Sequence, residues 1–294
     1  MFIPTVSTKF FGLFGNPLGQ SAGSFMHNSV YQTMGIDAQY VPIEMEMADL
    51  GDVITHMEKF NYAGAGVTMP FKTQAPKYLD GLAPSAIHSE VVNTIVIDEN
   101  GKKIGHNTDG VGFVLSLKEQ LGLSIPDHKY LILGSGGAAT AIACSLGADG
   151  AKHIRSLCLA RDYFCAETLF ERVNPHFPGV CGIGEMTDRT IAEGLEECDV
   201  IIHATKVGMH PKVDEILFNP ELLKPHHIVA DVVYVPVDTK LLQEAAKRGC
   251  RTLSGLWMNV NQAAEQMRLW LGIEPPLDFM YERGLEFIKQ RNNS

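Results

Sequence analysis

KYLILGSGGAATAI, residues 129–142, is the stretch that decides the fold. A short apolar run, Tyr130–Leu133, meets several glycines and passes directly into an alanine-rich run with helical character. Glycines at such a junction allow a tight turn, and they let a pyrophosphate approach the N–H groups at the helix N-terminus, where the dipole favours negative charge. The spacing Gly134-x-Gly136-x-x-Ala139 fits the dinucleotide-binding fingerprint, with alanine in the third place. The stretch therefore predicts the first βαβ unit of a nucleotide-binding domain, although glycine-rich turns also occur for packing reasons.

The next predicted strand, Ser156–Ala160, leads into Arg161 and Asp162. A carboxylate at a strand end can accept hydrogen bonds from the adenosine ribose hydroxyls of NAD, whereas an arginine can pair with the 2′-phosphate of NADP. Asp162 therefore favours NAD, and Arg161 leaves NADP open. A solvated Arg–Asp pair that caps the following helix is the alternative interpretation of the same two residues.

Length, composition and charge exclude several classes of protein. A chain of 294 residues is long enough for two domains, and a net charge of −10 does not favour a nucleic-acid partner. No apolar run reaches the roughly 18 residues that span a bilayer, and Met1–Lys9 lacks a signal-peptide pattern, so we expect a cytoplasmic protein without a membrane partner. The cysteines contain no C-x-x-C pair and the histidines no H-x-x-x-H pair, so no metal site is predicted.

Strand-like and helix-like stretches alternate through the first third of the chain, which predicts a largely parallel sheet. Two strand-like runs, Val91–Ile97 and Lys102–Gly105, flank Asn100-Gly101, and this dipeptide predicts an antiparallel hairpin at the edge of that sheet. No Pro- or Ser-rich linker precedes the Gly134 loop, so the domain boundary is expected in the helical run Asp109–Leu121. The other predicted strands are Phe10–Gly15, Tyr40–Ile43, Ala65–Met69, Val200–His203 and Ile228–Val233, and the other predicted helices are Phe25–Met34, Asp49–Phe60, Thr239–Arg248, Met258–Leu271 and Leu277–Gln290.

Three polar residues of the first domain stand where chemistry is expected. Lys72 lies just beyond a strand end, Asn93 interrupts an apolar strand, and Asp109 directly precedes a helix. An asparagine inside an apolar strand costs free energy unless it is hydrogen-bonded, so it indicates either a ligand contact or a satisfied structural amide. The other two residues also have structural interpretations, a surface lysine and a helix N-cap.

Several separated motifs, in order along the chain, resemble the shikimate and quinate dehydrogenase family over nearly the whole sequence. So many ordered matches are far more specific than any single one. They are Gly15-Asn16-Pro17 with His27-Asn28, Val67-Thr68-Met69-Pro70-Phe71-Lys72, Val92-Asn93-Thr94, Asn107-Thr108-Asp109-Gly110, the Gly134 loop, Ala204-Thr205-Lys206-Val207-Gly208-Met209, Asp231-Val232-Val233-Tyr234-Val235-Pro236, and Gly255 followed by Gln262-Ala263-Ala264.

The resemblance implies an α/β enzyme of two domains. An N-terminal α/β domain with a mostly parallel sheet, residues 1–108 plus 256–294, would bind a cyclic polyhydroxy acid, and a Rossmann-type domain, residues 109–255, would bind NAD or NADP. In that family the matching lysine and aspartate form the catalytic pair, so Lys72 and Asp109 are expected to handle the hydroxyl proton while hydride passes to the nicotinamide. The residues expected to contact the substrate are Ser21, Thr68, Asn93 and Gln262, with Tyr40 on its carboxylate side and Tyr234 toward the nicotinamide. Those expected at the cofactor are Gly134, Ser135, Gly136, Gly137, Ala138, Arg161, Asp162, Thr205, Lys206 and Gly255.

Departures from the family pattern bear on the choice of ligands. Ala160-Arg161-Asp162 replaces the Asn-Arg-Thr of strictly NADP-dependent members, and Lys206 stands where many biosynthetic members have serine, so NAD is favoured. The family binds the substrate carboxylate with two hydroxyls in a His-Ser-x-Ser-Pro run, which here reads Gln20-Ser21-Ala22-Gly23-Ser24. Gly23 stands in place of the second hydroxyl and Ser24 in place of the proline. Loss of one such hydrogen bond weakens binding by roughly 1.5–3 kcal/mol, unless a shift of the backbone lets Ser24 replace it. Trp257 and Glu90-Val91 also replace smaller family residues.

The expected activity is the reversible oxidation of a ring hydroxyl of shikimate, quinate or a close analogue to the 3-dehydro ketone, with either a biosynthetic role in the shikimate pathway of aromatic amino acids or a catabolic one. The alternatives are a family member that acts on another cyclic hydroxy acid, and a non-catalytic ligand or dinucleotide sensor. Methylenetetrahydrofolate dehydrogenases share the general architecture but fit Asn107-Thr108-Asp109-Gly110 and Gln262 poorly. A monomer or homodimer without nucleic-acid partners is expected.

Overall fold

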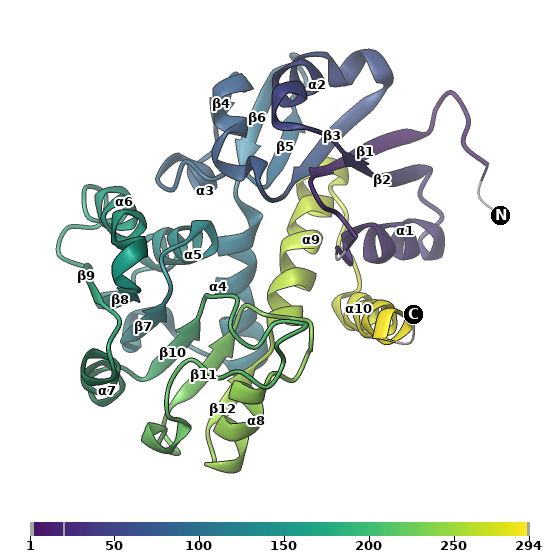
Figure 1. Ribbon diagram of the computed structural model, residues 1–294. Coiled ribbons are helices and arrows are strands. Elements are labelled where there is room, and N and C mark those ends of the chain that lie inside the picture. Colours follow the sequence, from purple (N-terminus) through teal and green to yellow (C-terminus); the bar gives the residue numbers. More distant parts are fainter. Residues whose placement is uncertain (1–2, 20, 293–294) are drawn as a thin grey trace. The chain divides into compact units, whose positions relative to one another are not determined.

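The structure is a computed structural model that describes residues 3–19 and 21–292 (Figure 1). The chain divides into two compact units, Met1–Thr108 with Val260–Ser294, and Asp109–Asn259. Within the described residues each unit contains one six-stranded sheet. The chain leaves the first unit at the start of helix α4 (Thr108–Leu121) and returns to it inside helix α9 (Gly255–Leu271), so both crossings are helical.

The sheet of the first unit is mostly parallel, with strand order β2-β1-β3-β5-β6-β4. Only β5 runs against its neighbours, because it forms the expected hairpin with β6 and pairs antiparallel with β3. The prediction that this hairpin lies at the sheet edge is wrong, since β4 pairs with β6 and takes the edge. A strand of two residues is too short to leave a pattern in the sequence. The strands are β1 (Lys9–Gly15), β2 (Ala38–Glu44), β3 (Tyr62–Val67), β4 (Gly81–Leu82), β5 (Thr94–Ile97) and β6 (Lys103–His106).

Side chains alternate along β1 between the two faces of this sheet, so apolar residues lie on both faces and helices cover both. Phe14 packs in a buried apolar cluster with residues of α2, while Phe11 stacks on Trp270 of α9 at 4.6 Å between ring centroids. The Trp270 indole donates a hydrogen bond to the carbonyl of Ile95 and lies so close to Gly64 that a side chain there would collide with the ring. The other helices of this unit are α1 (Gly23–Thr33), α2 (Leu50–His56), α3 (Pro84–Ile87) and α10 (Leu277–Asn292).

The sheet of the second unit is entirely parallel, with strand order β9-β8-β7-β10-β11-β12. This is the 3-2-1-4-5-6 order of doubly wound dinucleotide-binding folds, and the direction of winding reverses between β7 and β10. Ligands of such sheets bind outside the carboxyl ends of the strands at that reversal. The strands are β7 (Tyr130–Leu133), β8 (Ile154–Cys158), β9 (Cys181–Glu185), β10 (Val200–His203), β11 (Ile228–Asp231) and β12 (Arg251–Leu253), and the further helices are α5 (Gly137–Ala148), α6 (Tyr163–Val173), α7 (Asp188–Glu197) and α8 (Lys240–Lys247).

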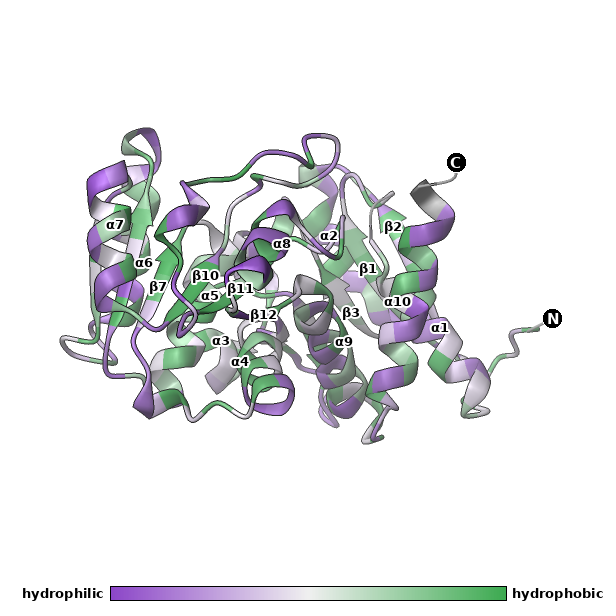
Figure 2. Ribbon diagram, turned by 90° about the horizontal axis from the view of Figure 1, so that it is seen from below, coloured by the Kyte–Doolittle hydropathy of each residue, from purple (hydrophilic) through white to green (hydrophobic). Residues whose placement is uncertain are grey.

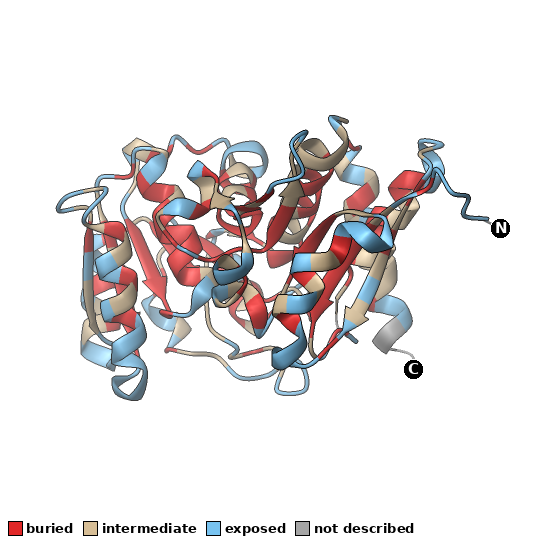
Figure 3. Ribbon diagram, turned by 90° about the horizontal axis from the view of Figure 1, so that it is seen from above, coloured by how far each residue is buried: buried red, intermediate tan, exposed pale blue. Residues whose placement is uncertain are grey.

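The central strands of the second sheet are apolar on both faces, as parallel strands covered by helices must be. Tyr130 and Ile132 of β7 pack into one buried cluster, and Leu131 and Leu133 into another on the opposite face. Figure 2 shows β7, β10 and β11 as strongly hydrophobic, and Figure 3 shows the buried residues concentrated in the strands and on the inward sides of the helices. The continuous apolar run before Gly134 is therefore explained by burial on two faces.

Most predicted strands and helices are found within a few residues of their predicted bounds. The strand predicted over Val91–Ile97 begins only at Thr94, so Asn93 precedes a strand instead of interrupting one. The sequence did not predict β9, whose glycine-rich stretch lacks an apolar pattern, nor α7. Across the described residues, no helix combines the length and the apolar character needed to cross a membrane.

Candidate functional site

Asn93 is the centre of a buried hydrogen-bond cluster in the first unit. Its amide oxygen accepts the backbone N–H of Thr108 at 2.7 Å, and its Nδ2 donates to the Thr108 hydroxyl at 2.9 Å and to Gln262 Oε1 at 3.4 Å. One turn further along α9, Gln266 donates to the hydroxyl of Thr94 at 3.0 Å. Asn93 is therefore a satisfied structural amide that ties the residues before β5 to the start of α4 and to α9. Contacts of Asn93 and Gln262 with a substrate remain a prediction.

Lys72 lies in a short turn that leaves β3 and is fixed through its backbone. Its carbonyl accepts the N–H of Val92 at 2.9 Å, directly before Asn93, and the neighbouring Phe71 is fully buried. The N–H of Thr68 donates to the carbonyl of Phe14 at 2.8 Å, which joins the same turn to β1. The structure thus brings Thr68, Lys72 and Asn93 to one end of the first sheet, with the Lys72 side chain half-buried.

Ser21 belongs to a segment that differs from the family pattern. Its hydroxyl accepts the backbone N–H of Gly23 at 3.3 Å, and a Cβ at Gly23 would lie 3.3 Å from that oxygen and 3.7 Å from the ring of Tyr40. Gln20, the first residue of the altered run, lies outside the described residues. Gly23 stands where the family pattern has the second serine, so this chain has one serine, Ser21, at the two hydroxyl positions of that pattern.

Tyr40 lies in the core of the first unit, with 3% of its surface exposed. Its ring stacks on His27 at 4.1 Å between centroids, and burial raises the pKa of its phenol well above the ordinary value. A side chain at Gly66 would collide with its hydroxyl. The tyrosine therefore has a packing role, and its expected place on the carboxylate side of a substrate stays a prediction.

Asp109 belongs to the second unit and lies in the first turn of α4. The helix begins at Thr108, so the interpretation of Asp109 as an N-cap is wrong. A carboxylate in the first turn of a helix is stabilised by the helix dipole, and Asp109 is 8% exposed. The next residue, Gly110, allows α4 to approach α5 closely, because a Cβ there would lie 2.3 Å from the carbonyl oxygen of Ala141.

The turn after β7 is shaped by glycine. Gly134 has φ +128°, and a Cβ on it would lie 2.5 Å from the carbonyl oxygen of Ala204, so no other residue fits. Gly136 precedes α5, and a Cβ there would meet no atom within 4 Å. No side chain caps α5 and no acidic residue stands in its first turn, which leaves the N–H groups of Gly137 and Ala138 at an open helix N-terminus. This backbone cradle, with the buried Ser135 inside it, fits a pyrophosphate.

Arg161 and Asp162 follow β8 in a short exposed turn. Their side chains are 80% and 52% exposed, and Arg161 Nε lies 3.7 Å from an oxygen of Asp162. The Asp162 carboxylate makes no capping hydrogen bond to α6, so the helix-capping interpretation is not supported. An exposed ion pair of this kind contributes little to stability, which leaves both side chains available at the strand end.

Two residues that were not predicted from the sequence end two strands on the other side of β7. His203 closes β10 and Asp231 closes β11, and both are 1% exposed. His203 Nδ1 lies 2.8 Å from Asp231 Oδ1, and His203 Nε2 lies 2.6 Å from the hydroxyl of Thr205. A polar residue at the end of an otherwise apolar strand, repeated in neighbouring strands, is the signal that would have found them.

Lys206 and Tyr234 follow these strand ends in the same unit, and Gly255 begins α9. A Cβ at Gly255 would lie 2.5 Å from the carbonyl oxygen of Val232, so its glycine is required by packing. Trp257 is half-buried and packs against the apolar cluster on one face of the sheet. Cofactor contacts of Lys206 and Gly255, and a place of Tyr234 near the nicotinamide, remain predictions.

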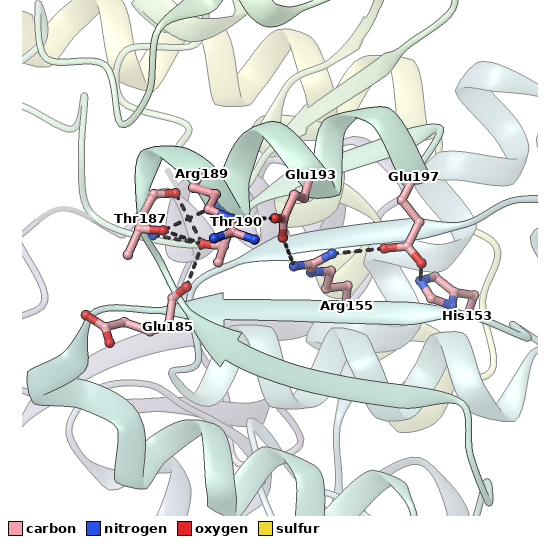
Figure 4. A network of polar contacts seen from close by, with 8 residues as sticks. All are labelled: His153, Arg155, Glu185, Thr187, Arg189, Thr190, Glu193 and Glu197. Carbon is pink, nitrogen blue, oxygen red and sulfur yellow. Dashed lines mark hydrogen bonds and ion pairs between the residues drawn. The ribbon is translucent and has the colours of Figure 1, made fainter.

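One group in the described residues has ligand atoms close enough for a metal ion. One ligand atom each of His153, Glu197 and Cys198 lies within 4.8 Å of the others. Burial raises the pKa of the Cys198 thiol to about 12, so the thiolate that binds metals is scarce at neutral pH. Figure 4 shows that Glu197 instead joins His153 to Arg155, which donates to Glu197 at 3.0 Å.

This polar network continues along α7, where Arg155 and Arg189 both bind Glu193 (Figure 4). A hollow of about 600 Å³ beside it is lined mainly by α7. Arg155 stands near the amino end of β8, whereas Gly134 follows the carboxyl end of β7, so in a parallel sheet the hollow lies at the edge opposite the glycine turn.

Comparisons with known proteins find relatives over nearly the whole chain. The shikimate dehydrogenase substrate binding domain matches residues 13–95, and the shikimate 5′-dehydrogenase C-terminal domain matches residues 255–283. A shikimate dehydrogenase (NADP(+)) of Alkaliphilus oremlandii is 36% identical over 281 residues, which are 95% of this chain and 97% of that protein.

Solved structures extend the similarity to the whole fold. Shikimate 5-dehydrogenase from Listeria monocytogenes, in complex with shikimate and NAD, matches with a TM-score of 0.90 and 36% identity over 96% of this chain and 98% of that one. Quinate dehydrogenase from Corynebacterium glutamicum, in complex with NAD, matches with a TM-score of 0.84 and 30% identity over 95% and 99%. The chain belongs to the shikimate dehydrogenase family.

Proposed function

We propose that this protein is an NAD(P)-dependent oxidoreductase that reversibly oxidises a ring hydroxyl of shikimate, quinate or a close analogue to the 3-dehydro ketone. Two features of this structure, in a chain that belongs to the shikimate dehydrogenase family, support the proposal. The Gly134 turn presents an uncapped helix N-terminus suited to a pyrophosphate. In the first unit, the backbone hydrogen bond from the N–H of Val92 to the carbonyl of Lys72 holds the backbone of Lys72 next to the residue before Asn93.

Lys72 and Asp109 are proposed as the proton-transfer pair. Bound NAD or NADP supplies the hydride acceptor. Oxidation of a secondary alcohol also releases the hydroxyl proton, and the amine of Lys72 is the proposed base that takes it. The carboxylate of Asp109, held in the first turn of α4, is proposed to orient the lysine and to balance its charge. In the reverse direction the protonated lysine returns the proton to the carbonyl oxygen.

NAD is proposed as the preferred cofactor. Asp162 stands at the end of β8, where a carboxylate can bind the adenosine ribose hydroxyls and repels a 2′-phosphate. Arg161 beside it is exposed and can pair with such a phosphate, so NADP is proposed as the second cofactor.

A substrate other than shikimate is supported by one specific observation. Of the two positions that supply hydroxyls in the family run, only the first, Ser21, has one here, because Gly23 replaces the second serine and Ser24 stands in place of the proline. Quinate, on which one structural relative acts, and other cyclic hydroxy acids are therefore included in the proposal.

The proposal is tested with purified protein, NAD or NADP, and a panel of shikimate, quinate and related cyclohexane acids, followed by absorbance of the reduced nicotinamide. We expect turnover of shikimate or quinate, with NAD at least as good as NADP. Lys72→Ala should lower kcat by about 10²–10⁴-fold with the dinucleotide Kd unchanged. Lys77→Ala, an exposed lysine of the same region, serves as the control and should leave kcat unchanged. Full activity of Lys72→Ala would remove the lysine from the mechanism, and no turnover by protein that binds dinucleotide would indicate a sensor.

A further inference from the structure

The carboxyl ends of β10 and β11 hold a buried polar chain that the proposed mechanism does not use. Three donors surround the carboxylate of Asp231: the ring nitrogen Nδ1 of His203 at 2.8 Å, the N–H of Val233 at 2.9 Å and the hydroxyl of Thr239 at 2.7 Å. His203 and Asp231 face each other in the strand register, so this arrangement is built on the sheet itself. A buried polar network with all its members satisfied holds its side chains in one geometry.

The donor and the acceptor of each hydrogen bond between Asp231, His203 and Thr205 can be assigned. An ionised carboxylate only accepts, so His203 Nδ1 carries a proton toward Asp231, and in a ring with a single proton Nε2 carries none. His203 Nε2 is then an acceptor, and the Thr205 hydroxyl, 2.6 Å away, donates its proton to it. Thr205 Oγ1 in turn accepts the N–H of Val207 at 3.1 Å. A hydroxyl has one proton and two lone pairs. In Thr205 the proton and one lone pair are engaged, so only one lone pair is left to accept a further hydrogen bond.

Thr205 also lies against the glycine turn. Its methyl group would lie 3.3 Å from a Cβ at Gly134, and the carbonyl of Ala204 lies against the same glycine. Thr205 therefore borders the reversal between β7 and β10, on the side of β10. The Arg161-Asp162 turn at the end of β8 lies on the opposite side of β7. In a doubly wound sheet a dinucleotide spans the reversal. If the adenosine lies over the end of β8, the nicotinamide half of the dinucleotide lies over the strands on the other side, beginning with β10.

We propose that His203 and Asp231 are positioning residues that hold Thr205 as a hydrogen-bond acceptor for a neutral donor on the nicotinamide half of the dinucleotide. The donor is either a hydroxyl of the nicotinamide ribose or the carboxamide N–H. A phosphate is excluded as the partner, because phosphate oxygens need a donor and the proton of Thr205 is already engaged. The inference rests on the proposed cofactor, and it extends that proposal to the second half of the molecule.

The test compares the binding of three ligands by titration calorimetry without substrate: ADP, ADP-ribose and NAD. ADP lacks the nicotinamide riboside, ADP-ribose adds the ribose, and NAD adds the carboxamide. Thr205→Val keeps the side-chain shape and removes the hydroxyl, and it should weaken NAD binding by about ten-fold while ADP binding stays unchanged. Thr205→Ser, the matched control, should keep wild-type affinity for all three ligands.

His203→Ala should reproduce the pattern of Thr205→Val if the histidine acts through the threonine. Its unchanged affinity for ADP serves as the check that the second unit is folded. Weaker binding of ADP-ribose by Thr205→Val identifies the ribose as the donor, and unchanged binding identifies the carboxamide.

Equal losses for ADP and NAD, or wild-type affinity of Thr205→Val for NAD, would overturn the inference. Wild-type protein that binds none of the three ligands would overturn it as well. If NAD binding follows the expected pattern but no cyclohexane acid is turned over, the proposed function fails and the inference stands.

Discussion

The glycine turn of the second unit and the Asn93 cluster of the first unit are built in opposite ways. Around Gly134 the geometry comes from backbone and from absent side chains, since a Cβ at Gly134 would collide with Ala204 and α5 has no capping side chain. Around Asn93 the geometry comes from side chains that bind one another, with Thr108 and Gln262 as partners. The turn leaves donors open for a ligand, whereas the cluster uses its donors to hold three segments together.

This difference sets what a ligand must do in each unit. A pyrophosphate at the glycine turn meets N–H groups that no protein side chain caps, so little rearrangement is needed. A substrate that binds the Asn93 side chain must compete with an existing hydrogen bond to Gln262, which at 3.4 Å is longer than the bonds of that side chain to Thr108. We therefore expect Gln262 to be the member that yields when a ring hydroxyl binds.

Gly134→Ala should have the largest effect on stability. The substitution places a side chain in a left-handed conformation and against the Ala204 carbonyl, so we expect a loss of about 3 kcal/mol or more in the free energy of unfolding. The measurement is urea unfolding followed by circular dichroism. Gly136→Ala is the matched control, because its Cβ meets nothing within 4 Å. It should keep stability and weaken dinucleotide binding, since the methyl occupies the space before α5. Equal stability of both variants with the wild type would show that backbone does not shape the turn.

Asn93→Ala should come next and tests the side-chain cluster. The substitution leaves the buried N–H of Thr108 without its acceptor, which costs about 2–3 kcal/mol. Asn100→Ala, in the exposed hairpin turn, should change stability by no more than about 0.5 kcal/mol. A fully stable Asn93→Ala variant that loses only substrate affinity would show that the asparagine is a ligand contact and not a structural amide.

The fold was predictable where one local pattern decides the structure. The run Tyr130–Leu133 followed by Gly134 predicts a buried strand and a tight turn from its own composition, and β7 has those bounds. The two-residue strand β4 and the glycine-rich strand β9 were not predictable, because their pairing depends on neighbours far away in the sequence. The antiparallel hairpin was predicted from Asn100-Gly101, but its place in the sheet was not.

The site was predictable only where motifs carry the chemistry. The glycines of the turn follow from backbone requirements, whereas the role of Lys72 comes from the family resemblance and stays a prediction. The link between His203 and Asp231 could not be predicted, because it depends on β10 and β11 lying side by side in register. The sequence could not decide whether Asn93 is a structural amide or a ligand contact for the same reason, since its partner Gln262 lies 169 residues further along the chain.

Acid should destabilise the first unit through His27. The ring is fully buried, donates from Nδ1 to the carbonyl of Gly23 at 2.9 Å and stacks on Tyr40, and burial lowers its pKa to about 4. An unfolded histidine takes up its proton near pH 6.5, so the unfolded chain binds more protons between pH 6.5 and 4. The contribution is complete above pH 6.5 and is lost as the pH falls toward 4.

Between pH 7 and pH 5 the loss from this histidine amounts to about 2 kcal/mol. Urea unfolding at both pH values measures it. His27→Phe keeps an aromatic ring against Tyr40 and cannot titrate, so its stability should change less between the two values than that of the wild type. An identical change in both proteins would assign the acid sensitivity to other groups.

Gly23→Ser should have the smallest effect on stability, and it tests the segment of the first unit that is expected to bind the substrate carboxylate. A Cβ at Gly23 meets Ser21 Oγ at 3.3 Å and the ring of Tyr40 at 3.7 Å, and the serine hydroxyl can move by a few tenths of an ångström. Stability should therefore stay within about 0.5 kcal/mol of the wild type.

The added hydroxyl restores the second donor of the family pattern, so the KM for shikimate should fall about ten-fold with kcat unchanged. Gly19→Ser, where a Cβ meets nothing within 4 Å, is the control and should leave the KM unchanged. An unchanged KM in Gly23→Ser would mean that this segment does not bind the carboxylate.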